Sequence, residues 1–140
     1  MFVKQLSVFI ENREGRLEQV TEVLAREGVN ILSLSMADTT EYGMLRMIVA
    51  NPQKAKDALC AEGFSAMLTD VIAVKLEDRV GELHKMLHIL CGLKLNIEYM
   101  YALASSGKRA MIVKASDGAA AVKALTEGGL SLFGNEEMCG

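Results

Sequence analysis

LSVFIENREGRL, at Leu6–Leu17, returns in altered form as IAVKLEDRVGEL at Ile72–Leu83, 66 positions further along the chain. GVNI at Gly28–Ile31 returns as KLNI at Lys94–Ile97 with the same spacing. A period of this length exceeds the roughly 20–50 residues that are usual for solenoid repeats. The chain is therefore predicted to be a duplicated small domain that carries the same strand, polar loop and helix start twice.

The repeat divides the chain into two predicted domains, residues 1–69 and 70–140. They meet at Thr69-Asp70 without a Pro/Gly/Ser-rich linker. Hydrophobic residues make up 51% of the chain and charged residues 24%, which is an ordinary balance for a globular protein. Each half is close to the size at which one hydrophobic core is barely sufficient. We therefore expect the domains to pack against each other or against another copy of the chain.

Charge and hydropathy argue against several classes of protein. The net charge is −3 and Lys and Arg form no cluster, which argues against nucleic-acid binding. No apolar run reaches the roughly 18 residues that a membrane-spanning helix needs. The first residues lack the basic and apolar regions of a signal peptide. A cytoplasmic location is the expectation.

The cysteines predict neither a disulfide framework nor a metal site, because three cysteines are spread far apart. Cys60 and Cys91 fall in predicted helices, where they are expected to be small buried residues. Cys139 is expected to be an exposed thiol.

The periodicity of apolar residues predicts the same elements in each half. Alternation, as in Leu6, Val8 and Ile10, indicates strands, whereas spacings of three and four from Leu83 to Leu90 indicate a helix. The predicted strands are 3–11, 31–36, 44–50 and 64–69 in the first half, and 71–77, 95–104, 109–114 and 130–133 in the second. Helices are predicted between the first and second and between the third and fourth strands of each half.

The resulting order, βαββαβ, is typical of the ferredoxin-like fold, an antiparallel sheet with both helices on one face. The predicted fold class is α+β with two such domains. Their sheets are expected to join side by side, because bare faces and edges need cover. Met47-Ile48-Val49 returns as Met111-Ile112-Val113 only 64 positions later. The hairpin of the second half is therefore predicted to be two residues shorter.

The loop after the first strand is the candidate binding site of each half. Glu11–Gly15 and Glu77–Gly81 precede a helix, whose N-terminal N–H groups and positive dipole end suit a carboxylate. Glycine lets a ligand approach the backbone, and the side-chain oxygen of Asn12 or Asp78 can accept from an ammonium group. A free amino acid carries both charges. A simpler interpretation stays open, in which Asn12 and Asp78 only cap their helices.

These residues resemble a known family, the ACT domain. Ile10–Leu17, followed by Gly28–Ile31, is especially similar to the serine-binding ACT domain of phosphoglycerate dehydrogenase. Asp78–Leu83, followed by Leu95–Ile97, resembles a second ACT domain. The resemblance covers essentially the whole chain and leaves no room for a catalytic domain. It implies that the protein senses a small molecule, usually an amino acid.

The resemblance also implies which residues bind the ligand. In similar domains, the first loop of one domain and the asparagine that begins the second strand of its neighbour share it. One implied pocket uses Asn12 and Gly15 with Asn96, and the other uses Asp78 and Gly81 with Asn30. The full implied set is Asn12, Arg13, Gly15, Asn30, Asp78, Arg79, Gly81 and Asn96.

The two implied pockets are not equivalent, because Asp78 is charged where Asn12 is neutral and Lys94 replaces Gly28. For Asn30 and Asn96 a simpler interpretation stays open. Asparagine is a common turn residue between a helix and a strand.

The expected function is that of a non-catalytic sensor. A homodimer is expected, because small duplicated sheets expose apolar faces and edges. It binds a free amino acid between two ACT domains and regulates amino-acid metabolism, without a cofactor. A regulatory subunit of a separate biosynthetic enzyme is one alternative, and a structural dimerisation module is another. An enzyme is a third, but the chain offers no set of nucleophile, base and acid.

A metal site is not expected. His84 and His88 are four residues apart on a predicted helix, a spacing that can hold a metal ion. No third ligand is evident from the sequence, which favours a solvated or interface pair.

Overall fold

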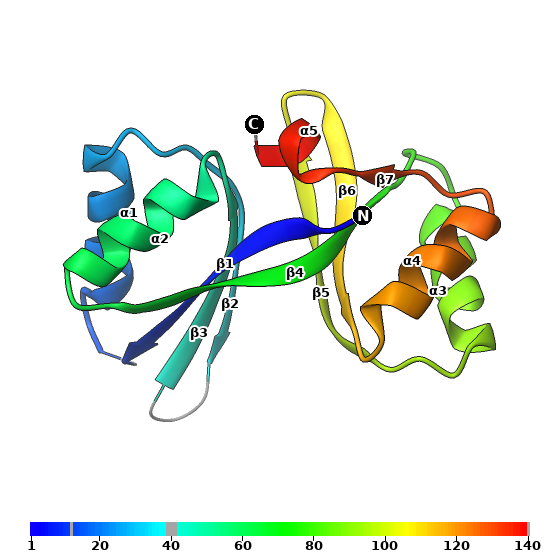
Figure 1. The fold of residues 1–140 in the computed structure, drawn as a ribbon, viewed down its shortest axis with the longest axis horizontal. Coiled ribbons are helices and arrows are strands. Elements are labelled where there is room, and N and C mark those ends of the chain that lie inside the picture. The colour runs from blue at the N-terminus through cyan, green and yellow to red at the C-terminus, as the bar shows by residue number, and fades with distance from the viewer. Residues whose placement is uncertain (12, 39–41, 140) are drawn as a thin grey trace. The chain divides into compact units, whose positions relative to one another are not determined.

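The computed structural model describes residues 1–11, 13–38 and 42–139, which cluster into two compact units (Figure 1). The first unit contains residues 4–69 together with Met138 and Cys139. The second unit contains residues 1–3 together with 70–137. Each terminal stretch therefore belongs to the unit that the other half of the chain mainly builds. The domain limits 1–69 and 70–140 stay a prediction.

The first unit has the predicted βαββαβ order. Its elements are β1 (Val3–Glu11), α1 (Arg16–Arg26), β2 (Ile31–Asp38), β3 (Tyr42–Val49), α2 (Pro52–Ala61) and the first part of β4 (Ser65–Lys75). The strand order is β2-β3-β1-β4, and β3 pairs antiparallel with both β1 and β2. Helices α1 and α2 lie on the same face of these strands (Figure 1).

The second unit repeats the arrangement. The later part of β4 is followed by α3 (Glu82–Gly92), β5 (Ile97–Ser105), β6 (Lys108–Ala115), α4 (Gly118–Glu127), β7 (Leu132–Phe133) and α5 (Asn135–Cys139). Antiparallel pairs give the order β5-β6-β4-β7, and α3 and α4 lie on the same face of the strands (Figure 1). The α+β fold with two ferredoxin-like repeats is confirmed. The side-by-side joining of the two sheets stays a prediction.

Strand β4 corrects one predicted boundary. The two strands predicted at 64–69 and 71–77 form one continuous strand, Ser65–Lys75. Its residues up to Thr69 belong to the first unit and those from Asp70 to the second. Thr69 and Asp70 are polar, which suggested a break, but a strand tolerates polar residues wherever a side chain is not in the core. Helix α5 was not predicted.

The strand register corrects the predicted length of the second hairpin. Leu34 lies opposite Met47, and Met100 lies opposite Val113, so both partners recur after 66 residues. The hairpins therefore have equal length, and the predicted two-residue shortening is wrong. Strand side chains alternate with a period of two, so a two-residue slip keeps every side chain on its face and escapes sequence comparison.

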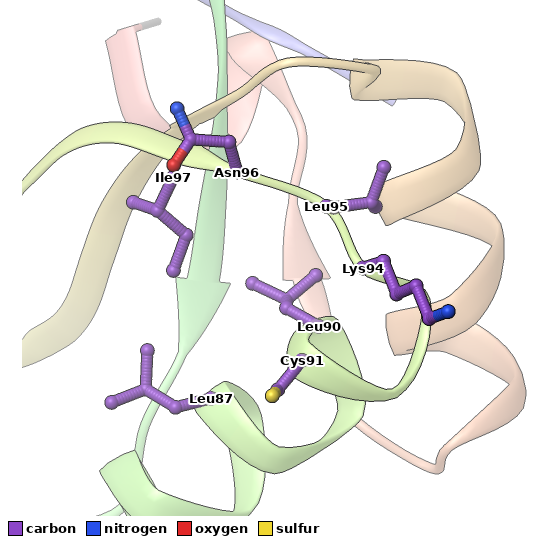
Figure 2. A pocket seen from close by; sticks show the side chains of 7 residues that line it. All are labelled: Leu87, Leu90, Cys91, Lys94, Leu95, Asn96 and Ile97. Carbon is purple, nitrogen blue, oxygen red and sulfur yellow. The ribbon is translucent and has the colours of Figure 1, made fainter.

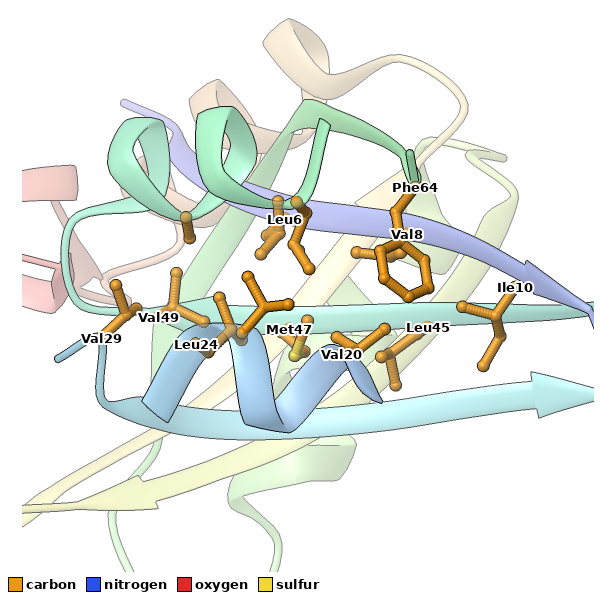
Figure 3. Close-up of a cluster of buried hydrophobic side chains, with 13 residues drawn as sticks. Leu6, Val8, Ile10, Val20, Leu24, Val29, Leu45, Met47, Val49 and Phe64 are labelled. Atoms are coloured by element: carbon orange, nitrogen blue, oxygen red, sulfur yellow. The ribbon is translucent and has the colours of Figure 1, made fainter. Parts of the chain in front are cut away.

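Each unit has its own hydrophobic core between its helices and its strands. In the first unit, Leu24 of α1 packs with strand residues that include Leu6 and Met47 (Figure 3). In the second, Leu90 of α3 packs with Val113 and other strand residues. Leu24 and Leu90 are equivalent positions of the repeat, and each is at most 1% exposed. Apolar residues whose spacing predicted the helices are therefore buried at equivalent positions of the two repeats.

The burial expected of the cysteines is wrong in each case. Cys60 and Cys91 lie on α2 and α3 but are exposed, whereas Cys139 is buried in the first unit. The Asn51 N–H donates to the Cys139 carbonyl oxygen, with a nitrogen–oxygen distance of 3.1 Å. A helix position alone does not place a small residue on the buried stripe. In the described part of the chain, no helix is long and apolar enough to cross a membrane.

Candidate functional site

The first loops of the two units have the same backbone hydrogen bonds. The Arg13 N–H donates to the Glu11 carbonyl at 2.8 Å, and the Arg79 N–H donates to the Glu77 carbonyl at 2.9 Å. In the next turn, the first helical hydrogen bonds are accepted by the carbonyls of Gly15 and Gly81, at 3.0 and 2.9 Å. The repeat therefore preserves the geometry of the loop as well as its sequence.

Gly15 and Gly81 occupy the N-cap positions of α1 and α3 with φ values of 83° and 91°. This left-handed conformation favours glycine, because other residues place Cβ against the backbone. Among the residues that the structure describes, no side chain caps either helix. The interpretation of Asp78 as a helix cap is therefore wrong. Asn12, its counterpart, lies outside the described residues. The N-terminal turns of both helices are suited to an anionic ligand.

The two arginines of the predicted set are tied to carboxylates of their own loops. Arg13 Nε lies 3.6 Å from a Glu11 carboxylate oxygen. Arg79 Nη2 lies 2.8 Å from Glu77 and 3.2 Å from Glu82. Both arginine side chains are largely exposed, so these ion pairs add little to the stability of the fold. Each arginine is therefore paired with a carboxylate close to it in the sequence.

Asp78 faces a pocket of about 360 Å³ in the second unit. Its carboxylate lies 3.3 Å from Arg109 Nη1. Charges of both signs surround the pocket, and one of them, the Lys108 ammonium, donates to the backbone carbonyl of Glu137. The lining residues are Lys75, Leu76, Glu77, Asp78, Gly107, Lys108, Arg109 and Phe133.

Asn96 lines a separate and mostly apolar pocket of about 500 Å³ in the same unit (Figure 2). Helix α3 supplies Leu87, Leu90 and Cys91, and the connection to β5 together with the first residue of β5 supplies the rest. The remaining lining residues are Lys94, Leu95, Asn96 and Ile97. An apolar pocket with a few polar groups is the usual form of a small-molecule site.

The backbone of Asn96 is fixed, and its side chain is exposed. Its N–H donates to Ser116 Oγ at 3.1 Å, and its carbonyl accepts from the Ser116 N–H at 2.8 Å. In the first unit, the Asn30 carbonyl likewise accepts from the Ala50 N–H, at 2.9 Å. The turn interpretation thus explains the backbone of each asparagine and leaves its side chain available to a ligand.

Of the residues that line this pocket the predicted set contains only Asn96, and Lys94 is the charged residue that it lacks. Its φ is 56°, although the equivalent residue of the first unit is Gly28, with a φ of 70°. A lysine in the left-handed region is strained by about 1–2 kcal/mol. Strain of this kind is concentrated at functional sites. The only signal in the sequence was the replacement of a glycine by a lysine between the two copies.

The structure places the predicted residues in distinct local settings. Asp78 and Asn96 belong to the same unit but line different pockets. The implied pairing of each first loop with the asparagine of the other repeat stays a prediction.

The chain belongs to the ACT domain pair family, which matches residues 1–139. It is similar to the crystal structure of protein BT0572 from Bacteroides thetaiotaomicron, with 36% identity and a TM-score of 0.91, over 99% of this chain and 96% of that one. No curated protein sequence matches it. The ACT domain pair is a regulatory module.

Two more distant structures share the fold. The ligand-free regulatory subunit of aspartate kinase from Thermus thermophilus has 22% identity and a TM-score of 0.60, over 91% of this chain and 93% of that one. The corresponding subunit from Thermus flavus has 24% identity and a TM-score of 0.55, over 89% and 91%. At these identities the likeness concerns the fold alone.

Proposed function

We propose that the protein is a non-catalytic sensor that binds a free amino acid and thereby regulates amino-acid metabolism in the cytoplasm. The observation that carries the proposal is the Asn96 pocket, in which strained Lys94 stands where the other repeat has glycine. A lysine ammonium attracts a carboxylate, the apolar wall of α3 suits a side chain, and the Asn96 amide can accept from an amino group.

The proposed ligand is shared with a first loop. The helix that follows Gly15, which no described side chain caps, offers backbone N–H groups to the ligand carboxylate, and Asn12 and Arg13 belong to the same loop. This loop and Asn96 form one proposed site. Asp78, Arg79 and Gly81, together with Asn30, form the other.

We further propose that a second copy of the chain completes these sites. Among the described residues, β2 pairs only with β3 and β5 only with β6, so each asparagine directly precedes an edge strand. Apolar side chains on these strands are partly exposed, at 42% for Leu34, 44% for Met36 and 38% for Met100. Unpaired edges of this kind invite pairing with another chain. A homodimer joined at these edges would bring a loop next to an asparagine.

Regulation requires that the ligand binds two states of the assembly with different affinities, because otherwise no equilibrium shifts. A ligand that joins two elements meets this requirement. It binds well only when the loop and the asparagine are held together. An enzyme of the pathway would then recognise the state that the ligand stabilises.

A thermal-shift screen of the twenty amino acids tests the proposal. Ligand at one hundred times its dissociation constant stabilises the native state by roughly 2.7 kcal/mol, which is a readily measured shift. We expect one amino acid, or a few of similar shape, to stabilise the protein. No response to any of the twenty would contradict the proposal and favour a structural module or a subunit that binds only a partner enzyme.

Titration of the ligand against two matched variants tests the site. Asn96→Ala removes the amide but keeps both backbone hydrogen bonds to Ser116, so the fold should be retained. We expect weaker binding by Asn96→Ala and by Asn12→Ala. Unchanged affinity in both variants would show that the assigned pairing is wrong. Gln53→Ala, an exposed change on α2, serves as the control and should leave binding unchanged.

A further inference from the structure

The exposed face of α3 carries the only two histidines of the chain. His84 and His88 are both exposed, and their ring centroids lie 5.9 Å apart. Residues four apart occupy the same face of a helix, one above the other. The two imidazoles therefore need only small side-chain rotations to direct one nitrogen each at a common point.

The space around this pair is open. Gly81 precedes His84 by three residues and Gly92 follows His88 by four, so both lie on the neighbouring turns of the same face. A Cβ placed on either glycine would meet no atom within 4 Å. Because both histidines are exposed, the remaining coordination positions of an ion held by both rings would be accessible to water.

The fold does not require these histidines. The equivalent residues of α1, 66 positions earlier, are Glu18 and Glu22. Helix α1 forms with the same length and the same kind of buried stripe as α3. The imidazole pair is therefore a property that the second repeat has and the first lacks.

We propose that His84 and His88 chelate one divalent transition-metal ion. Imidazole suits Ni²⁺, Cu²⁺ and Zn²⁺, and two histidines at this spacing bind one ion in metalloprotein helices. In the described part of the chain, no group of three or more His, Cys, Asp or Glu residues could hold a metal. The site is thus a two-ligand site, with water at the other positions. Binding exchanges water for imidazole and transfers no electrons.

Nickel titration of the untagged protein, followed by proton NMR, tests the site. The chain has two histidines, so the two imidazole Hε1 signals report on the site without interference. We expect paramagnetic Ni²⁺ to broaden both signals together and calorimetry to give one ion per chain. Broadening of one signal alone, or equal binding of Mg²⁺, would overturn the proposal, because hard cations prefer oxygen ligands.

Substitutions separate chelation from single-histidine binding. His84→Gln and His88→Gln should each lower Ni²⁺ affinity at least about tenfold, since loss of even an outer-shell partner costs about 10–100-fold. Cys91→Ser, on the next turn, is the matched control and should leave affinity unchanged. Wild-type affinity in either glutamine variant, or loss of binding in Cys91→Ser, would overturn the proposal.

The double variant His84→Glu/His88→Glu addresses folding, because it reproduces the Glu18/Glu22 pair of α1 in α3. We expect its circular dichroism to match that of the wild type while its Ni²⁺ affinity falls. Retention of wild-type Ni²⁺ affinity in this folded variant would contradict the proposed role of the imidazoles.

Discussion

At the scale of single residues, Lys94 has both a strained backbone conformation and a proposed role in ligand binding. Lys94→Gly should raise the free energy of unfolding by roughly 0.5–1 kcal/mol. The relieved left-handed strain of about 1–2 kcal/mol exceeds the extra chain entropy of glycine, about 0.4–1 kcal/mol. The same change should weaken binding of the amino acid found by the screen. Chemical denaturation and calorimetry measure the two effects.

Lys94→Gln is the matched control for that experiment. It keeps the left-handed strain but removes the charge, so stability should stay near that of the wild type while binding weakens. Unchanged affinity in both variants would show that the ammonium group does not contact the ligand.

Gly81 provides a purely conformational test. A methyl group on Gly81 meets no atom within 4 Å, yet φ is +91°. Gly81→Ala should therefore lower the free energy of unfolding by roughly 1 kcal/mol, because the cost comes from the backbone alone. Gly92→Ala in α3 has equal space and an ordinary φ, so it should stabilise by about 0.4–1 kcal/mol. Equal effects in urea denaturation would contradict this explanation.

At the scale of elements, the two repeats allow a paired test of their cores. Leu24→Ala in α1 and Leu90→Ala in α3 remove equivalent buried side chains. Each should lower the free energy of unfolding by roughly 2–5 kcal/mol. Met67→Ala, at 59% exposure, should change it by less than about 0.5 kcal/mol. A small effect of one leucine alone would show that the two cores are not equivalent.

Elements with strong periodicity were predictable from the sequence. Helix α3 was identified from its apolar spacing, and the βαββαβ order followed from the repeat. The continuity of β4 was not predictable, because the polar Thr69-Asp70 pair resembles a turn when tertiary contacts are unknown. The hairpin length was also missed. A two-residue slip is silent in an alternating pattern.

The candidate site was predictable only in part, because a pocket is made by residues distant in sequence. The repeat indicated the loop glycines and Asn96, which stay predicted binding residues. The apolar wall from Leu87 to Cys91 could not, since helix spacing does not show which residues a pocket exposes. The pairing of Asp78 with Arg109 depends on the strand register and was likewise invisible.

At the scale of the whole molecule, the ends of the described chain stabilise units built mainly by the opposite half. Met138 is 3% exposed and belongs to the first unit. Met138→Ala should therefore lower the free energy of unfolding by roughly 2–5 kcal/mol. Hydrogen exchange should show lost protection in α2, near Asn51, before α4. Glu136→Ala, an exposed control on α5, should leave both unchanged.

Preferential loss of protection in α4 would contradict the assignment of Met138 to the first unit. The experiment therefore tests, independently of any ligand, whether the C-terminal stretch packs in the unit that the first half of the chain mainly builds.

The packing of Met138 and Cys139 in the first unit has a consequence for synthesis on the ribosome. Domains usually fold in order as the chain emerges, at about 5–20 residues per second. Here the unit that is translated first lacks Met138 and Cys139 until nearly all of the other unit has been made. The nascent first half cannot reach its finished packing alone. The packing of Met138 and Cys139 in the first unit can be completed only after translation has passed residue 139.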